Sequence, residues 1–135
     1  MKGCNVRIAF DIHGVIDTYP KILKPMISML KATGQDVVIV SGPKSDEIWR
    51  EMVKLGISGV PYYSVVDFLE NQGVEFTYDS KSTPWCDEET WWDSKARICQ
   101  HYDIDYLIDD SYKYEPAFKL IDAEFIHISE IMEVR

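Results

Sequence analysis

Several residues of this chain have the groups that phosphate chemistry requires. They are Asp11, Ser41, Gly42, Lys95, Asp109 and Asp110. Carboxylates hold a hard cation such as Mg2+, and one of them can also attack phosphorus. A hydroxyl, backbone amides and a lysine can bind phosphate oxygens, and the cation reduces the repulsion between an anionic nucleophile and an anionic substrate. These residue types together predict a magnesium-dependent phosphate site.

The apolar runs next to these residues predict the strands that would position them. Residues 37–40 read Val-Val-Ile-Val, a β-branched run typical of a strand buried on both faces of a parallel sheet. Residues 6–10 and 106–108 are similar short runs, and each is followed by an aspartate. Ligands of open parallel sheets bind beyond the carboxyl ends of the strands, so these polar residues should converge there. Lys95 joins them because a helix that follows a parallel strand begins at that same edge.

Helical spacing and turn residues predict the remaining elements. Pro20 and Pro25 limit the start of a first helix to the segment between them, since proline is tolerated in a first turn but not deeper, and Gly34 would end it. Ser45 begins a second helix, with acids in its first turn, and Gly56 ends it. Further helices are predicted at 65–69, 90–102 and 116–121, and further strands at 74–78 and 124–128.

Alternating strands and helices predict an α/β fold with a doubly wound, mainly parallel β-sheet and helices on both faces. The chain of 135 residues has the size of a single domain, which we expect to span 1–135. Only a loop and one helix fit between Asp17 and Asp36, and only a short insertion fits before Lys95. We therefore expect no sizeable cap domain and an open site.

The composition and the net charge limit which classes of binding partner we expect. The net charge of -9 and the pI of about 4.7 disfavour nucleic acid and anionic membrane surfaces as partners, unless a metal ion intervenes. Cys4, Cys86 and Cys99 lack the CxxC spacing of zinc sites, and their odd number argues against a disulfide framework. With no long apolar stretch in the sequence, these features predict a cytoplasmic protein with reduced thiols.

The motifs, in their order along the chain, resemble those of the haloacid dehalogenase (HAD) superfamily over nearly the whole sequence. Residues 11–15, Asp-Ile-His-Gly-Val, are similar to the first motif of that family, an Asp-x-Asp-Gly-Thr/Val run after a hydrophobic strand. Ser41 is similar to the second motif, Lys95 to the third, and Leu-Ile-Asp-Asp-Ser at 107–111 to the acidic fourth. Within the superfamily, the segment from Lys95 to Asp110 is most similar to small deoxyribonucleotidase-type members.

The resemblance implies a phosphatase with a Mg2+ cofactor. Asp11 would be the aspartyl nucleophile and a metal ligand, the main-chain oxygen of His13 a second ligand, and Asp109 or Asp110 a third. Ser41 and Lys95 would bind the phosphoryl oxygens. The expected substrate is a nucleotide or another small phosphorylated metabolite. Capless members of the superfamily act on larger substrates, or they borrow a neighbouring subunit of a homo-oligomer as a lid.

His13 departs from the family pattern, because it replaces the carboxylate that protonates the leaving oxygen and then activates water. A histidine can do that work, since its unperturbed pKa of ~6.5 is close to neutral pH. Next to a divalent cation, however, the imidazolium form is disfavoured. We therefore expect slow or narrowed phosphatase activity, or none. The rival interpretation is a HAD-fold protein that binds Mg2+ and a phosphorylated ligand or a protein partner without turnover.

Each of these residues also has an ordinary structural interpretation. Asp11 could cap a loop or helix, Lys95 could be a solvated helix residue, and His13 could contribute only its backbone oxygen. Asp17 could cap the first helix or contact substrate. Three tryptophans could line the mouth of the site, stack on a nucleobase, or pack a helix onto the sheet. They are Trp85, Trp91 and Trp92.

Overall fold

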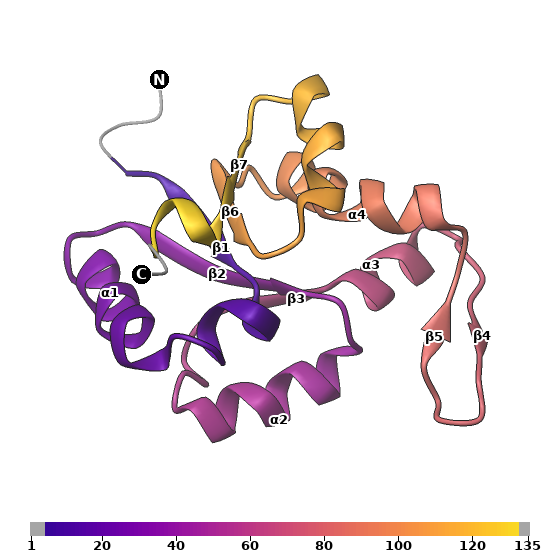
Figure 1. Cartoon of the computed structure of the whole chain (residues 1–135), viewed down its shortest axis with the longest axis horizontal. Coiled ribbons are helices and arrows are strands. Elements are labelled where there is room, and N and C mark those ends of the chain that lie inside the picture. The colour runs from indigo at the N-terminus through magenta and orange to yellow at the C-terminus, as the bar shows by residue number, and fades with distance from the viewer. Residues whose placement is uncertain (1–4, 133–135) are drawn as a thin grey trace.

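The computed structural model describes residues 5–132 and consists of one five-stranded parallel sheet with helices on both faces (Figure 1). All four pairs of neighbouring strands are parallel. In spatial order the strands are β3 (Tyr62–Ser64), β2 (Asp36–Ser41), β1 (Arg7–Phe10), β6 (Tyr106–Asp109) and β7 (Glu124–His127). The prediction of a doubly wound α/β fold is therefore confirmed.

Two hydrophobic clusters, one on each face, hold the helices to the sheet. Side chains alternate along a strand, so Val37 and Ile39 of β2 face one cluster while Val38 and Val40 face the other. The first cluster includes α1 (Pro20–Ala32) and α2 (Ser45–Leu55). The second includes α3 (Val65–Asn71), α4 (Glu88–His101) and the 3-10 helix η2 (Tyr112–Leu120).

Helix α1 corrects one expectation about proline. The helix begins at Pro20, inside the predicted interval, and Pro25 therefore lies within the helix, deeper than its first turn. Pro25 cannot donate to the carbonyl of Lys21, but both residues are exposed, so water can satisfy that carbonyl. The helix ends just before Gly34, which adopts φ +87° as predicted for a stop signal.

The segment between α2 and α4 differs most from the sequence-based expectation. Strand β3 was not predicted, because three residues are too few to show an alternating pattern. The strand expected at 74–78 is reduced to β4 (Thr77–Tyr78), which lies outside the main sheet. It pairs antiparallel with β5 (Pro84–Trp85), forming a hairpin that projects from the molecule (Figure 1).

The helix expected at 116–121 is the longer 3-10 helix η2, with Pro116 inside it. A short turn of helix, η1 (Ile12–Ile16), follows β1, and η3 (Ile128–Glu130) follows β7. No helix among residues 5–132 is long and apolar enough to cross a membrane. Cys86 and Cys99 are free thiols, whereas Cys4 lies outside the described residues.

The described residues contain no large insertion, which confirms the prediction that a sizeable cap domain is lacking. The hairpin of β4 and β5 is the main excursion from the two helical layers (Figure 1). Its position beside the carboxyl edge of the sheet matters for the site described below.

Candidate active site

The register of the two central strands brings Asp11 and Asp109 together. Phe10 of β1 pairs with Ile108 of β6, so the residue that follows each of them lies at the same level of the sheet. The amide N–H of Asp11 donates to the carbonyl of Ile108 at 3.1 Å, which continues the pairing to the strand end. Two aspartates that lie far apart in the sequence therefore meet at the carboxyl edge.

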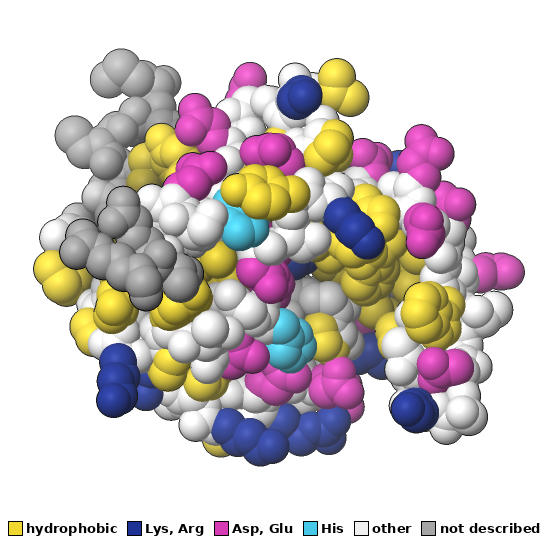
Figure 2. Space-filling model, in the orientation of Figure 1, with side chains coloured by type: hydrophobic (Ala, Val, Ile, Leu, Met, Phe, Trp, Pro, Cys, Tyr) yellow, Lys and Arg dark blue, Asp and Glu magenta, His cyan; other side chains and the backbone are white. Residues whose placement is uncertain are grey.

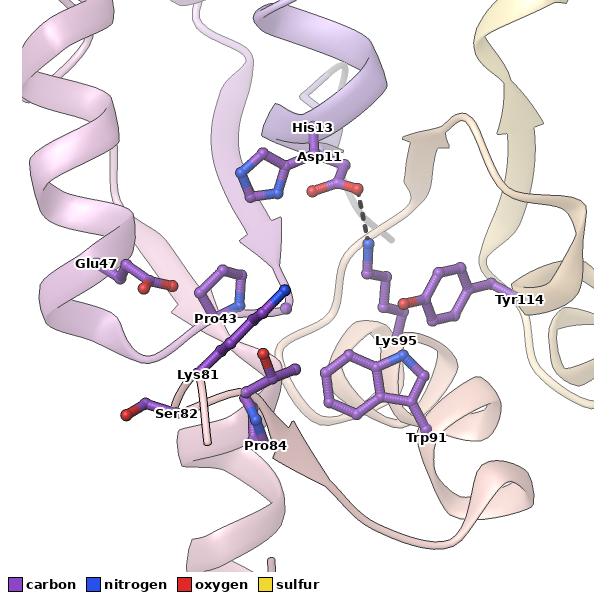
Figure 3. Close-up of a pocket in the computed structure, with 12 residues that line it drawn as sticks. Asp11, His13, Pro43, Glu47, Lys81, Ser82, Pro84, Trp91, Lys95 and Tyr114 are labelled. Atoms are coloured by element: carbon purple, nitrogen blue, oxygen red, sulfur yellow. Dashed lines mark hydrogen bonds and ion pairs between the residues drawn. The ribbon is translucent and has the colours of Figure 1, made fainter. Parts of the chain in front are cut away.

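Lys95 of α4 joins these two carboxylates, and Figure 3 shows its bond to Asp11. Its Nζ donates to Oδ2 of Asp11 at 3.0 Å and to Oδ2 of Asp109 at 2.5 Å. The ammonium also lies 4.4 Å from the ring centroid of Tyr114, a cation–π contact. Lys95 is only 1% exposed, so the interpretation of a solvated helix lysine is wrong.

Burial and charge compete in this cluster. Burial raises the pKa of Asp11 above its ordinary value, and the positive charge of Lys95 opposes that effect. Burial alone would lower the pKa of Lys95, but the charges of Asp11 and Asp109 outweigh it and hold that pKa above the ordinary 10.5. Lys95 is therefore a permanent cation that neutralises the carboxylates around it.

Asp110 completes a set of three carboxylates that could hold a cation. One oxygen from each of Asp11, Asp109 and Asp110 lies within 4.8 Å of the other two. Oδ1 of Asp109 accepts the amide N–H groups of Asp110 and Ser111, at 2.8 and 3.1 Å, while Oδ2 accepts from Lys95. Asp109 is thus buried and already bonded, whereas Asp110 is exposed and accessible to a cation from solvent.

Gly14 makes room for Asp110. Its φ of +75° is a left-handed conformation, and a Cβ added there would lie 1.9 Å from Oδ2 of Asp110. The turn η1 that contains Gly14 is tied by Asp17, whose Oδ1 accepts from the amide of Gly14 at 2.8 Å and from the hydroxyl of Thr18. Hydrogen bonds to the Asp17 carboxylate therefore stabilise the turn that precedes α1.

His13 lines the same cavity as Asp11, but its ring is paired with a carboxylate of α2. Its side chain is about half exposed, and its Nε2 lies 2.9 Å from Oε2 of Glu51 on α2. That oxygen of Glu51 is otherwise a buried atom without a hydrogen-bond partner among the described residues. A carboxylate beside one ring nitrogen orients an imidazole, so Glu51 fixes which edge of His13 faces the cavity.

Ser41 and Gly42 follow β2 as expected, but they occupy different environments. Ser41 is fully buried, and its hydroxyl has no hydrogen-bond partner among the described residues. An unpaired buried hydroxyl costs about 1–3 kcal/mol, so it needs an explanation. Gly42 lines the cavity, and a Cβ there would lie 3.2 Å from the ring of Trp91.

A cavity of about 380 Å3 opens above Asp11 and Lys95 (Figure 3). Figure 2 shows it as a hollow between the hairpin and the body of the molecule. Four of the predicted catalytic, phosphate-binding and metal-binding residues line it, namely Asp11, His13, Gly42 and Lys95, whereas Ser41, Asp109 and Asp110 do not. The other lining residues are Pro43, Glu47, Lys81, Ser82, Thr83, Pro84, Trp91 and Tyr114.

The three tryptophans have separate roles. Trp91 lines the cavity, and Trp92 packs edge-on against Tyr114 with its centroid at 4.8 Å. Trp85 is exposed on the hairpin, where its Nε1 donates to Asp79 at 3.1 Å. Of the three sequence-based interpretations, the mouth of the site therefore fits Trp91 and packing fits Trp92, whereas stacking on a nucleobase stays a prediction.

Sequence reasoning missed several contributors to this region. His127 of β7 was not among the candidate site residues, yet its Nε2 lies 2.8 Å from the main-chain oxygen of Asp110. Glu51, Lys81 and Tyr114 were also not anticipated. Only the position of His127 at a strand end gave a sequence signal, because the other three depend on how α2, the hairpin and η2 fold onto the sheet edge.

Comparison with known proteins adds no family or relative. No protein-family model matches the chain, and no curated protein matches its sequence. The geometry of the carboxyl edge is therefore the main evidence about function.

Proposed function

We propose that this protein is a magnesium-dependent phosphomonoesterase of the HAD type that acts through an aspartyl-phosphate. The observation that carries the proposal is the buried Lys95 ammonium, which bonds to both Asp11 and Asp109 at the floor of an open cavity. A buried lysine between two carboxylates at the carboxyl edge of a parallel sheet is a typical setting for a perturbed functional group.

The donor set fits Mg2+. Three carboxylates with convergent oxygens are the ligands that a hard cation prefers, and exposed Asp110 leaves room for the water that Mg2+ retains. Asp11 and Asp110 would hold the ion, with the main-chain oxygen of His13 as a further proposed ligand. Asp109 would support them through its hydrogen bonds with Lys95 and with the amide of Asp110. When bound, Mg2+ supplies positive charge that screens the carboxylate nucleophile from the phosphate dianion.

In the proposed reaction, an oxygen of Asp11 attacks phosphorus, so one phosphorus–oxygen bond forms while the bond to the leaving oxygen breaks. His13 donates a proton to that leaving oxygen as it departs. His13 then takes a proton from water as the water oxygen attacks the same phosphorus, and Asp11 is released with inorganic phosphate. Lys95 keeps its hydrogen bond to Asp11 and offers positive charge to the transferred oxygens.

Ser41 supports the proposal through its unpaired hydroxyl. This hydroxyl is buried at the end of β2, one residue before Gly42 of the cavity wall, and it has no hydrogen-bond partner among residues 5–132, so its capacity to donate remains unused. Gly42 adds backbone at the cavity wall, where the Trp91 ring lies close to its Cα position. A nucleotide or another small phosphorylated metabolite matches a cavity of this size.

The experiment that tests the proposal is release of phosphate from 4-nitrophenyl phosphate, with and without Mg2+, by the wild-type protein and by Asp11→Asn. We expect Mg2+-dependent turnover that Asp11→Asn reduces on the order of 10^3-fold or more, because a nucleophile is removed. Turnover that survives Asp11→Asn unchanged would contradict the proposal.

A second candidate is a HAD-fold protein that binds Mg2+ and a phosphorylated ligand or a protein partner without turnover. His13 favours it, because it replaces the usual acid/base carboxylate and its Nε2 is already paired with Glu51. The variant His13→Asp separates the two candidates. Hydrolysis gained in His13→Asp would show a site that lacks only its acid, whereas Mg2+ binding without any gain would favour the binding function.

A further inference from the structure

The wall of the cavity opposite the sheet edge comes from the β4–β5 hairpin. Lys81 and the three residues that follow it line the cavity that also contains Asp11 and Lys95. Figure 3 shows the side chain of Lys81 extending from the hairpin into the cavity, with its ammonium end directed toward the side on which Asp11 and Lys95 lie. A cation on the hairpin therefore faces the same space as the reactive carboxylate.

The two lysines of the cavity are not equivalent. The Lys95 ammonium is bonded to two carboxylates, so its charge is compensated within the protein. Lys81 forms no ion pair with any residue in the described part of the chain, although Glu47 also lines the cavity. In a protein with a net charge of -9, an uncompensated cation that points into a cavity is available for an anionic ligand.

The hairpin tip is held in a defined conformation. Oδ1 of Asp79 accepts the amide N–H groups of Lys81 at 2.8 Å and of Thr83 at 2.9 Å, and Ser82 adopts φ +62°. Lys44, at the start of α2, lies 5.1 Å from the ring centroid of Tyr78 and links the hairpin to the body. These contacts set the backbone from which Lys81 projects.

The space between the two lysines is lined by apolar surface. Pro84 of the hairpin, Pro43 after β2 and Trp91 of α4 line the cavity (Figure 3). The cavity volume of about 380 Å3 is within the range of sites for small organic ligands, so it has room for more than a phosphoryl group. A ligand with an apolar body and an anion at each end matches this lining.

We infer that Lys81 is a substrate-binding residue that recognises a second anionic group, such as another phosphate or a carboxylate, on the leaving-group side of the substrate. This inference rests on the proposed function, since the first phosphoryl group must bind at Asp11 and Lys95. It narrows the substrate class to phosphomonoesters that carry a second anion, and it makes the hairpin the specificity element of a protein without a cap domain.

The test uses non-hydrolysable ligands in pairs that differ only by one anion: propylphosphonate with propane diphosphonate, and hexylphosphonate with hexane diphosphonate. Their dissociation constants are measured by calorimetry, with free Mg2+ held constant, for the wild-type protein, for Lys81→Gln and for Lys119→Gln. Lys119 is an exposed lysine of η2 outside the cavity and serves as the matched control.

A charge-assisted contact is worth about 1.5–3 kcal/mol, so the wild-type protein should bind at least one diphosphonate about tenfold or more tighter than its monophosphonate. Lys81→Gln should reduce that preference to below about threefold, while Lys119→Gln should keep it. Equal wild-type binding within both pairs, or a preference that persists in Lys81→Gln, would overturn the inference and leave the proposed function standing. Failure of the wild-type protein to bind any of the four ligands would instead count against the proposed function, and the inference would fall with it.

Discussion

The carboxylate cluster at the sheet edge and the hairpin tip face the same cavity, but they are held in opposite ways. Lys95 and Asp109 are buried, and their bonds join elements that lie far apart in the sequence. Lys81 is exposed, and the bonds that order its backbone come from Asp79, two residues away. The proposed chemistry therefore depends on the global fold, whereas the proposed recognition by Lys81 depends on local turn structure.

This difference predicts how the two regions respond to mutation. A change in the carboxylate cluster should affect stability, metal binding and turnover together, because burial leaves no solvent to compensate a lost partner. A change at the hairpin should affect ligand selection and local order while leaving the free energy of unfolding nearly unchanged.

The largest expected effect is that of Lys95→Met. This variant leaves Asp11 and Asp109 buried without their cation, which should lower the free energy of unfolding by about 3–5 kcal/mol. Urea unfolding in the absence of divalent cations measures it. The control Lys119→Met should change the value by less than about 0.5 kcal/mol. A Lys95→Met protein as stable as the control would mean that the cluster is not held by charge.

Gly14→Ala should produce the next largest effect. The added Cβ clashes with Oδ2 of Asp110. In addition, alanine would have to adopt the left-handed backbone conformation of Gly14, and this strain alone lowers the free energy of unfolding by about 1–2 kcal/mol. Gly73 has a similar φ of +89° with nothing within 4 Å of its added Cβ, so Gly73→Ala controls for the backbone cost alone. Only Gly14→Ala should also weaken Mg2+ binding in calorimetry, by about tenfold or more. Equal Mg2+ affinity in the two variants would exclude Asp110 as a ligand.

His127→Phe tests whether support from β7 matters for the metal site. The variant keeps an aromatic ring against Tyr112, where the two rings now stack at 3.9 Å, but it loses the contact with the main-chain oxygen of Asp110. Loss of such an outer contact should weaken Mg2+ binding about tenfold. His127→Gln keeps a side-chain donor and should recover part of that affinity. If both variants bind Mg2+ like the wild-type protein, His127 is only a packing residue.

The smallest effect is expected at the hairpin tip. Hydrogen bonds from the backbone of Thr83 and from the Trp85 ring lower the pKa of Asp79 below its ordinary value of 3.8. The hydrogen bonds to the Asp79 carboxylate should therefore persist at neutral pH. They should be lost only when the carboxylate is protonated, as the pH falls below 3.8. The Nε1–H resonance of Trp85, followed by NMR during an acid titration, reports this change.

Asp79→Ala should mimic the acidified tip at neutral pH. We expect faster hydrogen exchange at the amides of Lys81 and Thr83 and an unchanged urea midpoint. The matched control is Asp122→Ala, which removes an exposed aspartate outside the cavity. A large shift of the urea midpoint in Asp79→Ala would show that the hairpin contributes to global stability, and the contrast between the two regions would then be wrong.

The parts of the fold that were predictable from the sequence are those set by long apolar patterns. Val-Val-Ile-Val at 37–40 and the run before Asp11 specified central strands, and the parallel register then brought Asp11 next to Asp109. Short elements were not predictable, because β3 has three residues and β4 and β5 have two each. Their structure depends on pairing partners that no local pattern specifies.

The candidate site likewise contains residues that the sequence predicted and residues that it could not predict. Asp11, Lys95 and Asp109 could be expected together, because strand ends and the start of a following helix share one edge of a parallel sheet. The role of Glu51 beside His13 and the entry of Lys81 into the cavity could not be foreseen, because both depend on packing between elements. The buried and unpaired hydroxyl of Ser41 likewise becomes evident only in three dimensions.

The proposed mechanism depends most on Asp11 as the acceptor of a phosphoryl group in a magnesium site. Beryllium fluoride mimics a phosphoryl group bound to a carboxylate, and its binding does not require turnover by His13. We predict a protein-bound fluorine-19 NMR signal that appears only when Mg2+ and beryllium fluoride are both present and that is lost in Asp11→Asn. A wild-type protein that gives no bound signal, or a signal that Asp11→Asn retains, would contradict the proposed mechanism.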